Sequence, residues 1–210
     1  MRRLYGKLYS ELAIELKELN YATISSKRQF RRTNKNGYYS IILSAAGQQP
    51  IEIEIFLGIR IDMVEDLVYQ FTNGLKEYGP YSTTLIVPTR KISSESQYYY
   101  SLATEKDIPN ILHKIIHFLN GQGFPFLAEY GNVRALNELY NQYPEQKLTY
   151  ITNEFHRALR GIVLAKLAQQ PQWKKLVDQY RAKLQKRGLP EVQMQSYERL
   201  VRFLTNYSFS

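Results

Sequence analysis

Residues 21–61 contain the feature that most restricts the fold, because polar and apolar residues alternate there between clear turn signals. Residues 51–55 read Ile-Glu-Ile-Glu-Ile, a period of two that places the isoleucines on one face of a strand. Asn36-Gly37 is a strong hairpin signal, and Gly-Gln-Gln-Pro at 47–50 marks a second turn. We therefore expect an antiparallel meander with strands at 21–33, 38–45 and 51–61.

Helical patterns lie on both sides of this meander. Leucines three and four residues apart predict a helix over residues 3–20. A crossing helix is expected over 62–75, followed by strands at 82–87 and 97–102. Residues 104–119 form a helix that Gly121 and Gly123 should end. Further helices are predicted at 132–143, 152–167, 171–186 and 191–206.

These elements predict an α+β fold in one domain spanning residues 1–210. An N-terminal helix, an antiparallel meander sheet of about five strands and the crossing helix make up a sheet-rich half, 1–103. A C-terminal helical half follows, 104–210. The length of 210 residues suits one domain.

The composition excludes several classes of protein. The chain contains no cysteine, which rules out a disulfide scaffold, a thiol nucleophile and a thiolate metal site. It shows neither a signal-peptide pattern nor an apolar run long enough to cross a bilayer, so we expect a cytoplasmic protein without a membrane partner. The formal net charge of +9 favours anionic partners, such as acidic proteins or nucleic acid.

Candidate catalytic and metal-binding groups all have structural explanations that suffice. His113 and His117 share a helix face, but the motif lacks the glutamate of a zinc protease and a third ligand. His156 is not accompanied by a nucleophile-elbow motif. In the cluster Asp62, Glu65 and Asp66, the first two are interpreted as a capping box, and the dipole at a helix start favours all three. We therefore predict no catalytic, cofactor-binding or metal-binding residue.

The basic and aromatic residues of the sheet are the candidates for contacts with a partner. Basic side chains between two turn signals are interleaved with aromatic ones, and a tyrosine run follows in a later strand; the candidate residues are Lys27, Arg28, Arg31, Arg32, Tyr98, Tyr99 and Tyr100. Such a surface suits a protein partner or a nucleic acid. Because strand residues alternate between faces, the cations cannot all share one side. A second basic cluster occupies residues 174–187.

Several segments resemble a known bacterial family. They include Leu-Lys-Glu-Leu-Asn-Tyr at 16–21, Phe-Arg-Arg at 30–32, the apolar strand 39–44 and Phe-Leu-Gly-Ile at 56–59. Residues 123–130 read Gly-Phe-Pro-Phe-Leu-Ala-Glu-Tyr, one residue longer than the family's version, and a helix follows at 134–139. Over its first two thirds the chain resembles the family catalogued as domain of unknown function 4304. The resemblance implies an uncharacterised bacterial protein without established catalytic residues.

Three functions stay open on the sequence. The first is a non-enzymatic protein-binding module, by analogy a toxin-immunity protein that binds and neutralises a toxin. The second is a nucleic-acid-binding protein that uses the basic strand and the basic C-terminal helix. The third is an enzyme of unrecognised type, which would need a pocket that holds His156 or the acidic cluster. The oligomeric state and the identity of the partner are not encoded in any motif.

Overall fold

The computed structural model describes residues 2–72, 76–92 and 99–207. Its contacts divide the chain into two compact units, each built from two segments. The first unit, here the sheet unit, comprises residues 1–59 and 86–129. The second, the helical unit, comprises residues 60–85 and 130–210. The chain passes from one unit to the other within β4, within β5 and within α4.

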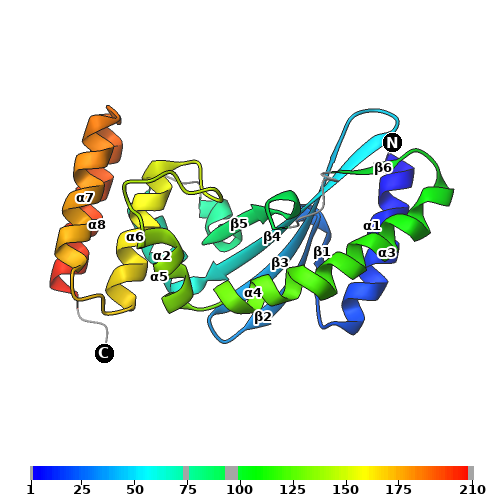
Figure 1. The fold of residues 1–210 in the computed structure, drawn as a ribbon, viewed down its shortest axis with the longest axis horizontal. Helices are drawn as coiled ribbons and strands as arrows, with labels where there is room; N and C mark the ends of the chain where they lie inside the picture. The colour runs from blue at the N-terminus through cyan, green and yellow to red at the C-terminus, as the bar shows by residue number, and fades with distance from the viewer. Residues whose placement is uncertain (1, 73–75, 93–98, 208–210) are drawn as a thin grey trace. The chain divides into compact units, whose positions relative to one another are not determined.

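The strands form one sheet in which β1 to β5 pair in sequence order. The elements are α1 (Arg2–Glu18), β1 (Ala22–Ile24), β2 (Gln29–Asn34), β3 (Gly37–Ala46), β4 (Ile51–Ile61), β5 (Leu85–Pro88) and β6 (Tyr100–Leu102). The sheet order is β1-β2-β3-β4-β5, and β6 pairs antiparallel with β4. The Asn-Gly turn is confirmed, because Asn34 pairs with Gly37 across the hairpin of β2 and β3. Figure 1 shows β1 to β4 as arrows running from blue to cyan.

The single strand predicted over residues 21–33 is wrong. The 3-10 turn η1 (Ser25–Lys27) divides it into β1 and β2, which pair antiparallel. The turn closes at Arg28, whose φ of 50° lies in the left-handed region. Because an arginine gives no sequence signal for that conformation, the interruption cannot be seen in the residue pattern.

One face of the sheet, the helix-covered face, carries α1 and α4 (Phe124–Tyr130). The ring of Tyr9 in α1 stacks on Phe30, with 4.7 Å between centroids. The ring of Phe124 stacks on Tyr21, and the guanidinium of Arg32 lies over Tyr21. Phe30 and Arg32 point to the same side of β2 because they are two residues apart. Leu8, Leu12 and Leu16 of α1 are fully buried, as the leucine stripe predicts.

The helix predicted to end at Gly121 and Gly123 in fact continues. α3 (Ile108–Phe118) passes through a π-helical turn, η5 (Leu119–Gly123), directly into α4. A Cβ at position 123 would lie 3.0 Å from a methyl carbon of Leu119 and 3.3 Å from the Phe118 ring. Gly123 therefore permits close packing inside the helix and does not terminate it.

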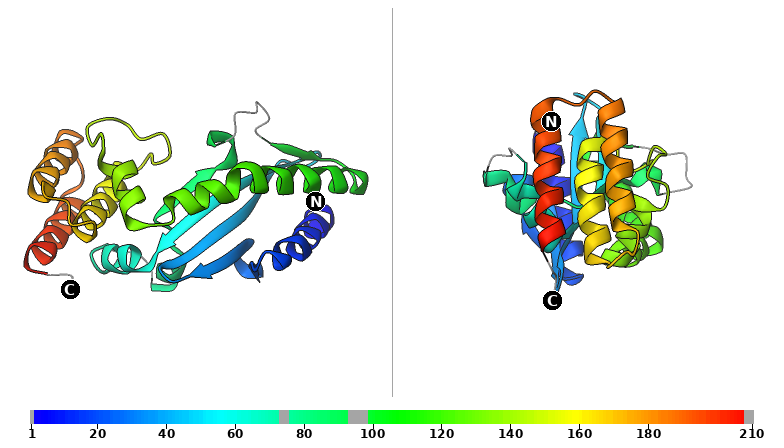
Figure 2. Two further views of the ribbon diagram at one scale, coloured as in Figure 1. Left: turned by 60° about the horizontal axis from the view of Figure 1, so that its bottom comes forward. Right: turned by 90° about the vertical axis from the view of Figure 1, so that its left-hand side faces the viewer.

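The helical unit is built from α2 (Asp62–Gln70), α5 (Val133–Asn141), α6 (Glu154–Leu167), α7 (Trp173–Lys186) and α8 (Glu191–Asn206). Helix α6 lies at its centre and contacts α2, α5, α7 and α8. The right-hand view of Figure 2 shows α6, α7 and α8 side by side. Nine of the α6 residues are buried, including Leu159, Ile162 and Val163, so α6 is the core of the unit.

The predicted α+β class is confirmed by this combination of an antiparallel sheet and a mostly helical second half. Four 3-10 segments, η1, η2 (Lys76–Tyr81), η3 (Thr89–Lys91) and η4 (Glu105–Asp107), connect the regular elements of the described residues. Within those residues, each helix is too short or too polar to cross a membrane. The single domain predicted for residues 1–210 stays a prediction, since compactness alone does not test independent folding.

Candidate protein-binding site

The sheet unit has a hollow along one side of α1, here called the α1 trough. Its volume is ≈ 640 Å³. One wall is helical and the other comes from β1, η1 and the end of β3; the lining residues are Tyr5, Gly6, Tyr9, Ser10, Ala13, Thr23, Ser25, Arg28 and Ala45. The α1 residues span about 12 Å along the helix axis, at 1.5 Å per residue. The trough therefore has room for a short stretch of peptide.

The two tyrosines of α1 are held in place by the sheet. The hydroxyl of Tyr5 donates a hydrogen bond to the backbone oxygen of Leu43 at 3.1 Å. The rings of Tyr5 and Tyr9 stack at 6.2 Å, and Tyr9 also stacks on Phe30. Burial raises the pKa of both tyrosines, so both hydroxyls stay protonated at neutral pH. The wall of the trough is thus rigid, aromatic and uncharged.

Gly6 leaves a gap in the helical wall of the trough because it has no side chain. It lies inside α1, where glycine costs about 1 kcal/mol relative to alanine. A Cβ at this position would meet no atom within 4 Å, so packing gives no reason for the missing side chain. What the glycine does is leave the trough open between Tyr5 and Tyr9.

Arg28 provides the charge of the trough. Its guanidinium lies over the ring of Tyr5, 5.2 Å from the centroid. Its backbone has a φ of 50°, a conformation that costs a non-glycine residue about 1 kcal/mol or more. Glycine would adopt it without strain, so the fold alone does not call for arginine there. A bound carboxylate would gain a cation at this end of the trough.

The sheet exposes an edge beside the trough. β1 is the terminal strand of the described sheet, and it pairs on one side with β2. The outer backbone groups of a terminal strand can pair with an added strand. Thr23 of β1 lines the trough itself. An extended peptide could therefore reach both the strand edge and the helical wall.

The predicted contact residues divide among several places. Arg28 lines the trough, and Lys27 is exposed beside it in η1. Arg31 points to the opposite face of β2, 4.0 Å from the centroid of Tyr38. Arg32 is on the helix-covered face, over Tyr21 and Tyr39. The four cations therefore do not form one patch, as the alternation of strand side chains requires.

The tyrosine run lies elsewhere in the sheet unit. Tyr98 lies outside the described residues. Tyr99 is 42% exposed, and Tyr100 begins β6, where it pairs with Ile53. The rings of Tyr5, Tyr38, Tyr21 and Tyr39 contact the guanidinium groups of Arg28, Arg31 and Arg32. The tyrosines of the trough, Tyr5 and Tyr9, were not identified from the sequence, although their i, i+4 spacing beside Gly6 marks a helix face distinct from the leucine stripe.

Three of the six cations in the second basic cluster pair with carboxylates within the helical unit. Arg181 pairs with Glu198 at 2.6 Å and also contacts Asp178. Lys183 and Arg187 lie 3.0 and 3.8 Å from the carboxylate of Glu154. These side chains therefore stabilise the packing of α6, α7 and α8 more than they offer free charge.

The capping-box interpretation of the acidic cluster is wrong. α2 begins at Asp62, and the residue before it, Ile61, gives no side-chain cap. Asp62 and Asp66 instead pair with the buried Arg60 at 2.6 and 2.5 Å. Glu65 is 1% exposed and pairs with Arg160. The arginines that explain the cluster are distant in sequence or lie before the helix, where no motif reveals them.

The histidines lie in two different environments. His113 and His117 are exposed on one face of α3, with ring centroids 6.3 Å apart. His156 is half-buried in α6, and burial together with Arg160 lowers its pKa. Among the described residues, no group of three or more histidine, aspartate or glutamate side chains is arranged to hold a metal ion. The α1 trough is lined by none of the three histidines.

Comparisons with family models, with curated proteins and with solved structures find no match to this chain. The resemblance of residues 16–139 to the domain-of-unknown-function family 4304 therefore stays a prediction.

Proposed function

We propose that the protein is a non-enzymatic binding module whose α1 trough holds an extended, acidic segment of a partner protein. The trough itself supports this most directly, because it joins an unpaired strand edge, an aromatic wall and one cation. Peptides commonly bind by adding a strand to a sheet edge, while pockets beside that edge select side chains. A toxin-immunity role, in which the partner is a toxin, is one form of this proposal.

Two residues of the trough support binding over a purely structural role. Gly6 leaves open space in a helix where alanine would stabilise the fold. Arg28 occupies a left-handed position where glycine would cost less. Residues kept against local stability cluster at functional sites. The acidic character of the partner follows from Arg28 and from the net charge of +9.

The test is selection of peptides from a random library on the purified full chain. Selected peptides should carry Asp or Glu, and a synthetic copy should bind in solution by fluorescence anisotropy. Gly6→Trp should weaken this binding at least tenfold by filling the trough. Gly121→Trp is the matched control, since a Cβ at that helical glycine also meets no atom within 4 Å. Arg28→Gly should weaken binding of the acidic peptide while the fold is kept.

Two results would refute the proposal. One is a selection without enrichment of acidic residues. The other is equal loss of binding with tryptophan at position 6 and at position 121, which would place the peptide elsewhere.

A further inference from the structure

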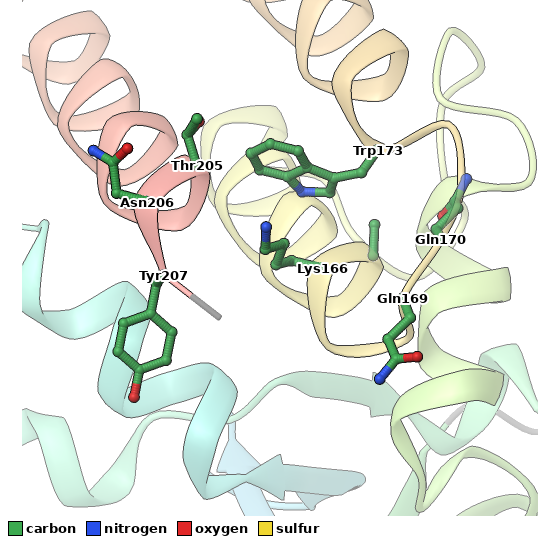
Figure 3. Close-up of a pocket in the computed structure, with 8 residues that line it drawn as sticks. Lys166, Gln169, Gln170, Trp173, Thr205, Asn206 and Tyr207 are labelled. Carbon is green, nitrogen blue, oxygen red and sulfur yellow. The ribbon is translucent and has the colours of Figure 1, made fainter. Parts of the chain in front are cut away.

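The helical unit has a second hollow region around the C-terminal end of α8, here called the α8 cleft. It consists of two adjoining hollows of ≈ 450 and ≈ 420 Å³, which share Asn206 and Tyr207. The first is lined by residues from the end of α6, the start of α7 and the end of α8: Ala165, Lys166, Gln169, Gln170, Trp173 and Thr205 (Figure 3). The second is completed by Phe71, Arg199, Arg202 and Phe203.

Aromatic rings follow one another along the cleft. Phe203 stacks with Tyr207 at 5.0 Å between centroids and an interplanar angle of 23°. Phe203 also contacts Phe71 at 5.4 Å. Tyr207 is 45% exposed and extends from the end of α8 (Figure 3). The cleft thus offers an accessible ring that is backed by two further rings.

Trp173 lines the first hollow but is buried, at 7% exposed. Its indole nitrogen donates a hydrogen bond to the backbone oxygen of Ile162 at 2.8 Å, which fixes the ring. The ammonium of Lys166 lies 4.9 Å from the ring centroid. Figure 3 shows both side chains facing the same hollow. The ring thus holds the ammonium of Lys166 at the first hollow, where it can contact a phosphate.

The second hollow carries two cations on one face of α8. Arg199 and Arg202 are three residues apart, both are exposed, and Phe203 and Asn206 continue the same face. Within the described part of the chain, neither guanidinium pairs with a carboxylate, in contrast to Arg181 and Lys183 of α7. None of the described residues that line the cleft is an aspartate or a glutamate. The residues that line the cleft therefore carry a net positive charge.

Gln169 lines this cleft in the same backbone conformation that Arg28 has in the α1 trough. Its φ is 55°, just after α6, where glycine is the usual residue. Three described residues other than glycine have a positive φ, and the third, Asn20, is of a type that tolerates it. The other two each line a hollow. Gln169 thus places an amide at the cleft at a cost in backbone energy.

We propose that the α8 cleft binds single-stranded nucleic acid, independently of the peptide site in the sheet unit. Lys166, Arg199 and Arg202 contact phosphates. The exposed ring of Tyr207, backed by Phe203, stacks on an unpaired base. Stacking of bases on aromatic side chains beside a cationic track is the general mode of single-strand binding. Paired bases are already stacked on each other, so a duplex cannot use this ring.

The experiment measures binding of a fluorescein-labelled 12-mer of thymidine to the full chain by anisotropy at several salt concentrations. Three phosphate contacts predict a slope of log affinity against log salt of about −2, at roughly −0.7 per contact for single strands. Arg199→Gln with Arg202→Gln should reduce the slope by more than half and the affinity at least tenfold. The matched control, Lys147→Gln with Lys186→Gln, removes the same charge from exposed positions of the same unit and should change affinity less than threefold.

Tyr207→Ala tests stacking separately from charge. Loss of one base stack should lower the affinity about fivefold or more without changing the salt slope. The proposal is overturned if the control pair weakens binding as much as the arginine pair, or if a duplex of the same length binds equally well. It is also overturned if the chain does not bind the 12-mer at 50 mM salt, or if a phosphopeptide binds the cleft more tightly than the 12-mer does.

Discussion

Glu65 and Arg160, which are 95 residues apart in the sequence, form an ion pair with two hydrogen bonds inside the helical unit. The arginine Nε donates to one carboxylate oxygen at 2.7 Å and Nη2 donates to the other at 2.8 Å. Glu65 is on α2 and Arg160 on α6, so the pair joins the two segments from which the unit is built. Bidentate geometry of this kind is specific as well as strong.

Removing one partner of this pair should destabilise the protein severely. Arg160→Met leaves the carboxylate of Glu65 buried without compensation, at a cost of about 3 kcal/mol or more. Adding Glu65→Gln removes the buried charge, so the double variant should recover part of the loss. Urea unfolding of both variants measures the difference. A double variant less stable than Arg160→Met alone would contradict this account.

Acid should weaken the same pair at low pH. Burial alone would raise the pKa of Glu65, but Arg160 and hydrogen bonds from Ser82 and Thr84 together hold it below the ordinary 4.5. A carboxyl with a depressed pKa stabilises the fold above its unfolded pKa, and that stabilisation is lost as the pH falls through the folded pKa. We expect stability to fall below pH 4.5, and the slope to decrease in Glu65→Gln.

His156 should add a separate loss of stability at a higher pH. Burial and Arg160 lower its pKa below 6.5, so the folded chain resists a proton that the unfolded chain accepts. Stability is therefore highest above pH 6.5 and falls as the pH drops below it. The chain has three histidines, so their C2 protons can be followed by NMR. Titration of the His156 signal at or above pH 6.5 would disprove this prediction.

Two helical glycines should respond oppositely to alanine. At Gly161 in α6 a Cβ would lie 2.7 Å from Asn141 Oδ1 and 2.9 Å from the Tyr180 hydroxyl. These two groups hydrogen-bond each other, so Gly161→Ala should cost about 1–3 kcal/mol. Gly6→Ala, in open space, should instead stabilise the fold by about 0.5–1 kcal/mol. Thermal unfolding of both variants gives the sign directly.

Alanine usually gives a more stable protein than glycine, but we expect the opposite at positions 28 and 169. Both have positive φ, so glycine should be more stable than alanine there by about 1 kcal/mol, although both substitutions remove the same functional groups. Comparing Arg28→Gly with Arg28→Ala isolates the free-energy cost of the left-handed backbone at position 28. The comparison of Gln169→Gly with Gln169→Ala does the same at position 169. Equal unfolding midpoints within each pair would show that the left-handed conformation is not retained.

The sequence predicts the regular elements well where a local pattern determines them. The leucine stripe gives α1, the Asn-Gly turn gives the β2–β3 hairpin, and the last helix was predicted with the same ends as α8. Prediction from the sequence fails where the structure of a segment depends on residues that pack against it in space. Gly123 is required by Leu119 and Phe118 rather than by a helix end.

The candidate sites could be predicted only in part, for the same reason. The charge of Arg28 marks it as a candidate in the sequence, but the other residues that line the trough with it are mostly on α1 and at the end of β3. Neither the α8 cleft nor the ion pair of Glu65 with Arg160 has a local signature, because their members come from helices that are far apart in the chain. Charge counts alone indicate α7 rather than α8, although carboxylates pair with Arg181 and Lys183 of α7.

The interleaving of the two units bears on how the gene can be divided. A protein fragment that ends at residue 129 contains the whole sheet unit and also residues 60–85, which belong to the helical unit. In that fragment α2 would display Val64 and Val68, which are buried in the full chain, and Glu65 would lack Arg160. We therefore expect such a fragment to aggregate. Because each unit consists of two separate segments of the chain, neither unit can be added or removed by joining or cutting the gene at a single point. A recombination between related genes that preserves both units must preserve all three places where the chain passes between them.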